Sequence, residues 1–251
     1  MKPYFDKFGC LNLTGKPKPK NKKNNLEQVL VFADENIIKV LDEDGTFIKI
    51  KERDRHVLAL CFHNEKLYDA GYDGKILDTF SDEVIAEREY RVHNLCSHNE
   101  KLYDSGYYQD IFETFKNIGI AKRNNATFSL CSHEGKLYDA GYDGKIFNTF
   151  SNEVIAERGK VIRSLCSHEG KLYDAGYNKK ILDTFNNEIF TEKKDGIYLL
   201  CSNEGRLFGV CSSEIYDSFT NEVVFKGTNI TSMTSCPRQY FVKQGILEAR
   251  T

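Results

Sequence analysis

The amino-acid sequence predicts an all-β protein in which one small sheet is repeated around a ring. The first observation is a repeat: residues 165–177 recur almost unchanged at 130–142, 95–107 and 60–72, and a more divergent copy begins at Leu200. Its register is marked by six cysteines at intervals of 35 residues: Cys61, Cys96, Cys131, Cys166, Cys201 and Cys236. A period of about 20 to 50 residues is typical of solenoids, propellers and other arrays.

The second observation is the spacing of turns within one repeat, for which residues 126–160 serve as the example. Four short strands are expected, at 127–132, 136–142, 145–150 and 153–157. Two of the turns between them are Glu134-Gly135 and Asp143-Gly144. We expect Asp143-Gly144 to form a type I′ turn, in which both central residues need positive φ. Turns this close leave no room for a helix of average length, about 11 residues, which excludes a repeat of helix pairs.

The third observation is that each expected sheet carries apolar side chains on both faces, such as Leu137, Tyr138, Ile146 and Phe150. A four-stranded unit of this kind is not stable alone. Packing such units around an axis buries both faces and leaves only short, protected edges. The predicted architecture is therefore a closed β-propeller.

The number of blades follows from the two ends of the repeat array. Complete repeats are expected near 56–90, 91–125, 126–160, 161–195 and 196–229. Residues 29–32, 37–41 and 47–50 supply three further strands, and residues 230–236 have the register of a first strand. Joining these ends gives six four-stranded blades in one domain, residues 26–251. Residues 240–243 also resemble a second strand that would compete with 29–32, so counts of five or seven blades stay open.

Two segments of this pattern resemble the blades of WD-repeat propellers: residues 164–172, and residues 140–146 in the preceding repeat. The resemblance covers the first three strands of each repeat, about 26 to 229 overall. The sequence departs from that family because it has no tryptophan and lacks the Gly-His pair before the first strand. The hydrogen-bonded tetrad that those residues build is therefore not expected here.

Composition limits the classes of partner. The net charge is −2, from 35 basic and 37 acidic residues, so no nucleic-acid partner is expected. No apolar run approaches the ~20 residues that span a bilayer, and the N-terminus does not resemble a signal peptide. Residues 1–25 lie outside the repeat, and their lysine-rich run at 16–23 predicts a basic flexible segment.

The cysteines indicate a reducing compartment. Six of the eight occupy equivalent repeat positions, as buried small apolar residues would, and not as a disulfide framework would. We therefore expect reduced thiols in a cytoplasmic protein, and a monomer.

Aromatic residues give the candidate partner-binding site. Four tyrosines precede the turn between the second and third strands, a turn that lies on the face usually used for partners in WD-like blades. The predicted binding residues are Tyr72, Tyr107, Tyr108, Tyr142 and Tyr177. Tyrosine is enriched at interface hot spots, and the turn sequences beside these residues differ from blade to blade. Packing of the tyrosines between blades is an equally weighted alternative.

Histidines give an alternative site of a different class. His63, His98, His133 and His168 are also 35 residues apart, and imidazole is a common metal ligand. A ring of them in the channel would suit a metal-binding enzyme of lyase or hydrolase type. The competing interpretation places each histidine at an exposed blade corner, far from the others.

Repeated aspartates have a structural interpretation. Asp69, Asp104, Asp139 and Asp174 are expected to accept hydrogen bonds from backbone N–H groups between strands. The chain shows no Ser-His-Asp spacing, phosphate-binding loop or Cys-x-x-Cys motif. The sequence thus predicts a non-catalytic platform for protein–protein interaction, without a cofactor, with the histidine-ring enzyme as the alternative.

Overall fold

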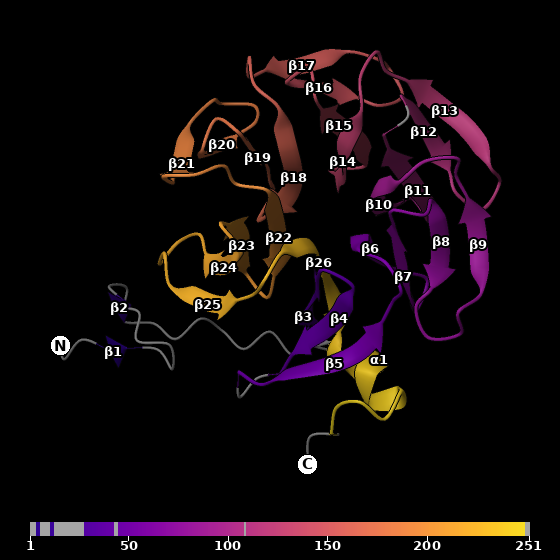
Figure 1. Cartoon of the computed structure of the whole chain (residues 1–251). Helices are drawn as coiled ribbons and strands as arrows, with labels where there is room; N and C mark the ends of the chain where they lie inside the picture. Colours follow the sequence, from indigo (N-terminus) through magenta and orange to yellow (C-terminus); the bar gives the residue numbers. More distant parts are fainter. Residues whose placement is uncertain (1–3, 6–10, 13–27, 43–44, 108, 249–251) are drawn as a thin grey trace.

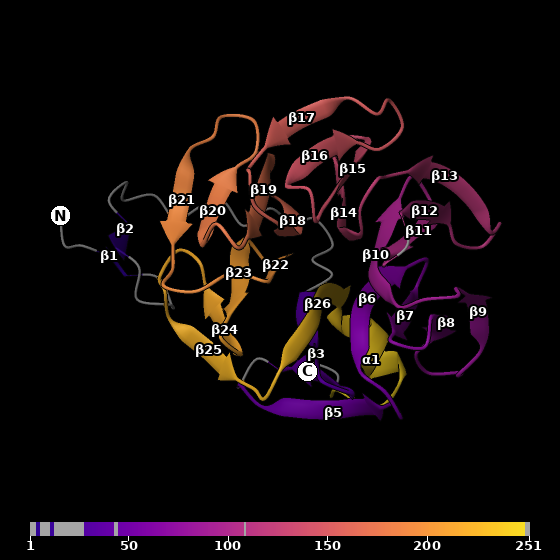
Figure 2. The ribbon, with the colours of Figure 1, turned by 45° about the horizontal axis from the view of Figure 1, so that its top comes forward.

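In the computed structural model, residues 4–5, 11–12, 28–42, 45–107 and 109–248 are described. Within them, six four-stranded antiparallel sheets surround a central axis, so the predicted six-bladed propeller is confirmed (Figures 1 and 2). No helix of these residues is long and apolar enough to cross a lipid bilayer. The predicted flexible segment 1–25 lies outside the described residues, except for β1 (Tyr4–Phe5) and β2 (Leu11–Asn12), which pair with each other.

We number the blades from the one that contains both ends of the ring. Blade 1 contains β26 (Ile230–Pro237), β3 (Gln28–Asp34), β4 (Ile37–Leu41) and β5 (Phe47–Glu52). Blade 2 contains β6 (Val57–His63), β7 (Lys66–Gly71), β8 (Lys75–Asp78) and β9 (Val84–Glu87). Blade 3 contains β10 (Val92–His98), β11 (Lys101–Gly106), β12 (Asp110–Glu113) and β13 (Ile118–Lys122). Blade 4 contains β14 (Thr127–His133), β15 (Lys136–Gly141), β16 (Lys145–Asn148) and β17 (Val154–Glu157).

The last two blades follow the same order. Blade 5 contains β18 (Ile162–His168), β19 (Lys171–Gly176), β20 (Lys180–Asp183) and β21 (Ile189–Glu192). Blade 6 contains β22 (Leu199–Asn203), β23 (Arg206–Cys211), β24 (Glu214–Asp217) and β25 (Val223–Lys226). In each blade the first strand named lies nearest the axis (Figure 1).

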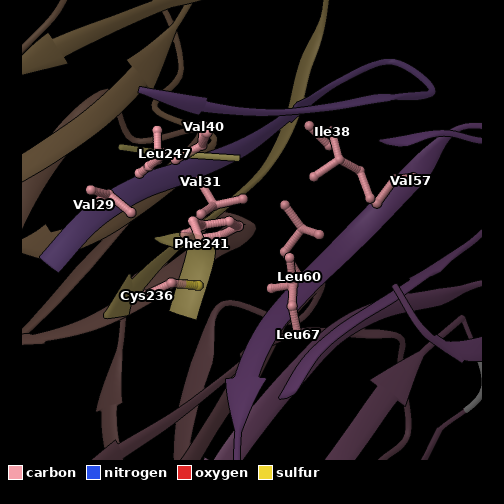
Figure 3. Close-up of a cluster of buried hydrophobic side chains, with 11 residues drawn as sticks. Val29, Val31, Ile38, Val40, Val57, Leu60, Leu67, Cys236, Phe241 and Leu247 are labelled. Carbon is pink, nitrogen blue, oxygen red and sulfur yellow. The ribbon is translucent and has the colours of Figure 1, made fainter. Parts of the chain in front are cut away.

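Blade 1 closes the ring by pairing the two ends of the chain. β26 runs antiparallel to β3, with Met233 opposite Phe32 and Cys236 opposite Val29. Residues 240–243 are not a strand: they lie in helix α1 (Arg238–Lys243), because Pro237 lacks the N–H that a ladder needs. Phe241 of α1 packs in one buried cluster with Val31 and Cys236 (Figure 3).

The register of β26 differs from the predicted one. In blade 2 the first strand has a bulge between Val57 and Ala59, and His63 is its sixth residue after Val57. The same bulge in β26 lies between Ile230 and Ser232, so Cys236 occupies the position of His63 and not that of Cys61. The interval of 35 residues is coincidental at this last cysteine.

One predicted turn type is also wrong. Glu134 and Gly135 have φ of 46° and 73°, as a two-residue type I′ turn requires. At Asp143-Gly144 only Gly144 has positive φ, at 73°. The amide of Gly144 donates to the carbonyl of Gly141, which gives a three-residue loop, a type I turn followed by a glycine in the left-handed region.

The hydrophobic core lies between neighbouring blades. Cys131, Tyr138 and Ile146 of blade 4 pack against Ile162 and Leu165 of blade 5, and similar clusters fill the other interfaces. Burial raises the pKa of the Cys96 and Cys201 thiols to about 12, so these sulfurs stay protonated and unreactive at neutral pH.

Thiol labelling of the folded protein should therefore separate two classes of cysteine. The six repeated cysteines are buried, whereas Cys211 is only partly buried. We expect rapid labelling of Cys211 and protection of the other six until denaturant is added, measured by mass spectrometry of peptides. Fast labelling of Cys131 or Cys166 in the folded state would contradict this.

Buried ion pairs tie consecutive blades together. Arg123 follows the outer strand of blade 3 and donates from Nε and Nη2 to the two carboxylate oxygens of Asp139 in blade 4, at 2.7 and 2.6 Å. The hydroxyl of Thr149 donates to the same carboxylate at 2.9 Å. We call this group the interblade latch. The arginine–aspartate pair recurs at three other interfaces, where Arg53, Arg88 and Arg158 pair with Asp69, Asp104 and Asp174. The threonine hydroxyl bond recurs at Asp104 and Asp174. In place of the expected backbone N–H groups, these aspartates thus have arginine as a partner and, at Asp104, Asp139 and Asp174, also threonine.

The two remaining interfaces use different groups. Between blades 5 and 6, Lys193 stands where the arginine would be, and its Nζ lies 3.6 Å from the centroid of the Tyr216 ring. Gly209 stands at the aspartate position, where a Cβ would lie 2.5 Å from the Tyr216 hydroxyl. Between blades 6 and 1, Asp34 accepts from the backbone amides of Thr228 and Asn229 at 2.9 Å.

Candidate binding face and channel mouth

Exposed aromatic rings gather where the second strand meets the third in blades 2 to 5. Tyr72, Tyr107, Tyr142 and Tyr177 have exposed fractions of 52, 55, 62 and 47%, so the structure does not bury them between blades. Tyr90 and Tyr198 add two more rings, because Tyr90 contacts Tyr107 and Tyr198 contacts Tyr177. We call these six residues the tyrosine face. Tyr108, also predicted to bind a partner, lies outside the described residues.

Cationic side chains hold part of the tyrosine face in place. The guanidinium of Arg91 lies 5.5 Å from the ring centroid of Tyr72 and 4.8 Å from that of Tyr107. His56 meets Tyr72 edge-on, with 5.6 Å between ring centroids. Cation–π and edge contacts of this kind stabilise ring positions, so these two tyrosines are partly ordered before any partner binds.

A β-bulge in the innermost strand turns one side chain of most blades toward the channel. The register shifts lie between Val57 and Ala59 in β6, and at the same place in β10, β14, β18 and β26. Such bulges re-aim the extra residue. The extra residues are Leu58, His93, Phe128, Arg163 and Thr231, and all five line the channel cavity. Tyr198 stands at the same repeat position before β22.

This repeat position distinguishes the blades from one another. Its residue type differs in all six blades, whereas the second and third residues after it are Leu-Cys in blades 2 to 6. Arg163, His93 and Phe128 were not predicted as site residues, because the prediction rested on residue types that recur from blade to blade. The available signal was the opposite one, a position that differs in every blade close to a nearly constant Leu-Cys pair.

The channel mouth is electropositive. Burial, followed by the charges of Arg163 and Arg91, lowers the pKa of His93 to about 3. The Arg163 guanidinium lies 4.5 Å from the centroid of Phe128, and His93 meets the same ring edge-on at 5.1 Å. His93 is therefore neutral near pH 7, and the charges that act on it among the described residues are those of Arg163 and Arg91.

The repeated histidines lie elsewhere and are buried, so their predicted exposed position is wrong. His63, His98, His133 and His168 have exposed fractions of only 2 to 3%. Each Nδ1 lies 2.8 or 2.9 Å from the hydroxyl of a serine in the next blade, namely Ser97, Ser132, Ser167 and Ser202. Each histidine is the last residue of its innermost strand. Its ring therefore lies at the interface with the next blade.

These contacts leave the histidines as links between blades. In the part of the chain that the structure describes, no group of three or more His, Cys, Asp or Glu side chains is placed to hold a metal ion. The ring of imidazoles on which the lyase or hydrolase alternative depends is thus not brought together there.

The comparisons with known proteins show similarity in fold. The sequence matches no protein-family model and no curated protein. The structure is similar to a chain in a nidogen/laminin complex, with a TM-score of 0.70 at 10% identity over 83% of this chain and 98% of that one. It is also similar to the WD40 β-propeller domain of Doa1, with a TM-score of 0.55 at 12% identity over 79% of this chain and 78% of that one. A computationally designed protein, Ika8, has a TM-score of 0.50 at 12% identity, over 81% of this chain and 76% of its own. The expected resemblance to WD-repeat propellers is thereby confirmed at the level of the fold.

Proposed function

We propose that this protein is a non-catalytic platform that binds a partner protein through the tyrosine face. The observation that carries the proposal is the exposure of Tyr72, Tyr107, Tyr142 and Tyr177 at equivalent corners of consecutive blades. Tyrosine contributes a large contact area at low entropic cost and is common among interface hot spots. The turns beside these residues differ, so the face presents a non-repeating surface on a repeated frame.

The proposal also includes a cellular compartment and an oligomeric state. Free cysteines packed between blades suit a reducing compartment such as the cytoplasm, which is where we place the protein. We also propose that it acts as a monomer, because each blade already has both neighbours within its own ring.

Replacing Tyr142 and Tyr177 with alanine tests the proposal. Since both side chains are about half exposed or more, we expect little change in melting temperature. If they are hot spots, each substitution should weaken partner binding by ~1–3 kcal/mol, about tenfold in affinity per 1.4 kcal/mol. The measurements are thermal unfolding and the affinity for a partner first captured from native extract with the wild-type protein.

Phe150→Ala provides a matched control. Phe150 is an aromatic residue of the same blade as Tyr142, it is 52% exposed, and it lies at the opposite end of the strands, beside His98. We expect this variant to keep the captured partner. A lower melting temperature of the tyrosine variants with unchanged affinity would assign the tyrosines to the fold and overturn the proposed interface.

A further inference from the structure

The mouth of the central channel contains a charge that has no counter-ion among the described residues. Arg53, Arg88, Arg123 and Arg158 each face a buried aspartate, whereas the side chain of Arg163 forms no ion pair or hydrogen bond with any described residue. Its Nε is buried without a partner. The side chain of Arg91, also free of ion pairs within the described residues, adds a second positive charge close enough to affect Arg163.

The residues around this charge are hydrogen-bond donors. Ser129 accepts from the backbone amide of Leu165 at 2.8 Å, and Ser164 accepts from that of Leu200 at 2.9 Å. Because each hydroxyl oxygen is occupied as an acceptor, its own proton remains available to donate. No described residue accepts it.

Asn94 repeats this arrangement in blade 3. Its side-chain carbonyl accepts from the amide of Leu130 at 3.1 Å, which fixes the orientation of the amide group and leaves its NH₂ as a donor. No described residue accepts from that NH₂. Asn94, Ser129 and Ser164 stand one residue after the bulge in three consecutive blades, and all three line the cavity with Arg163.

Apolar side chains line another part of the cavity, which Ser97, Thr231, Ser232 and Thr234 also line. Leu58, Leu199 and Met233 line it together with the donors, and no carboxylate does so among the described residues. Its volume is about 200 Å³, equivalent to roughly seven waters at ≈ 30 Å³ each. The site therefore has a cationic, donor-rich part and an apolar part, and room for a small molecule only.

We propose that this channel mouth binds a small organic anion, with a carboxylate or phosphate group on Arg163, Ser129, Ser164 and Asn94 and an apolar body toward Leu58 and Leu199. Guanidinium groups pair with both anions in a forked geometry. The anion would also supply the counter-charge that the described residues do not provide at this place. This proposal does not rest on the proposed partner binding, although Arg163 lies close to Tyr177 and Tyr198 of the tyrosine face.

The proposal can be tested with simple probes at constant ionic strength. Butyrate represents the carboxylate, inorganic phosphate the phosphate group, and butyramide a neutral molecule of the same shape as butyrate. We expect saturable binding of butyrate or phosphate by calorimetry and a matching rise in melting temperature, with no effect of butyramide. Whether butyrate or phosphate binds more tightly identifies the preferred anion.

Two variants complete the test. Arg163→Met should weaken anion binding at least tenfold and leave the melting temperature of the unliganded protein unchanged or higher, because it removes a partly buried charge that has no counter-ion among the described residues. Arg206→Met, which removes an arginine paired with Asp217 on the rim of blade 6, should keep full anion binding. The proposal is overturned if neither anion binds saturably, if butyramide binds as well as butyrate, or if Arg163→Met binds the anion normally. A clear loss of unliganded stability in Arg163→Met would also overturn it, since Arg163 would then be a structural residue.

Discussion

Replacing Arg123 with alanine should lower the free energy of unfolding by about 3–5 kcal/mol. The guanidinium and its partner Asp139 have exposed side-chain fractions of 7 and 1%. The substitution would leave a buried carboxylate with only the Thr149 hydroxyl as a side-chain partner. A buried charge that loses its counter-ion is far more costly than a surface pair. Equilibrium unfolding in urea, followed by circular dichroism, measures the loss.

Two further variants make this result specific to the latch. Lys122→Ala removes the neighbouring residue, whose Nζ is 4.0 Å from Asp110 and whose side chain is 71% exposed, so it should cost less than about 1 kcal/mol. Combining Arg123→Met with Asp139→Leu removes both charges and should recover most of the loss, because apolar pairs of similar volume replace buried ion pairs well. Equal effects of Arg123→Ala and Lys122→Ala would show that the latch contributes nothing beyond a surface contact.

Deleting residues 230–251 should destabilise the protein more than any single substitution. It removes β26, leaves β3 with an unpaired edge and takes away the surface on which β6 of blade 2 packs. Exposed strand edges promote aggregation, and each blade depends on its neighbours for stability. We expect aggregation, or a cooperative transition at a much lower temperature, by light scattering and calorimetry.

A shorter deletion separates ring closure from the contribution of the helix. Removing residues 238–251 deletes α1 but keeps β26. It exposes Phe80, which contacts Tyr240 and Phe241, and frees the amide of Leu67, which donates to the Tyr240 hydroxyl at 3.2 Å. This variant should stay folded with reduced stability. An unchanged melting transition in the longer deletion would mean that closure by β26 does not stabilise the ring.

The fold was predictable because the local and the repeated signals agree. Turns such as Glu134-Gly135 set the strand lengths, the interval of 35 residues set the blade size, and three unpaired strands at one end required a partner at the other. The register of β26 was not predictable in the same way. Its sequence diverges from the other first strands, and only its ladder with β3 shows that Cys236 takes a histidine position.

The environment of polar side chains was harder to predict than the strands. Arg123 precedes Asp139 by the same number of residues as Arg88 precedes Asp104. This interval alone does not show that an arginine after the outer strand of one blade contacts an aspartate in the middle of the next blade. His133 was expected at an exposed corner, because a hairpin end is usually solvated. The neighbouring blade covers it with Phe185 and Ser167, a contact that only the packing of two blades defines.

Ring closure also has a consequence for synthesis on the ribosome. β3 leaves the ribosome early, whereas its partner β26 follows only after roughly 200 more residues, about 10–40 s later at ordinary rates of about 5–20 residues per second. During that time Val31 and Phe32, which are fully buried in the finished ring, belong to a sheet edge with no partner. Blades 2 to 6 can assemble in order on the nascent chain, but the first blade to be started is the last to be completed, and its edge is the segment that a chaperone would need to shield.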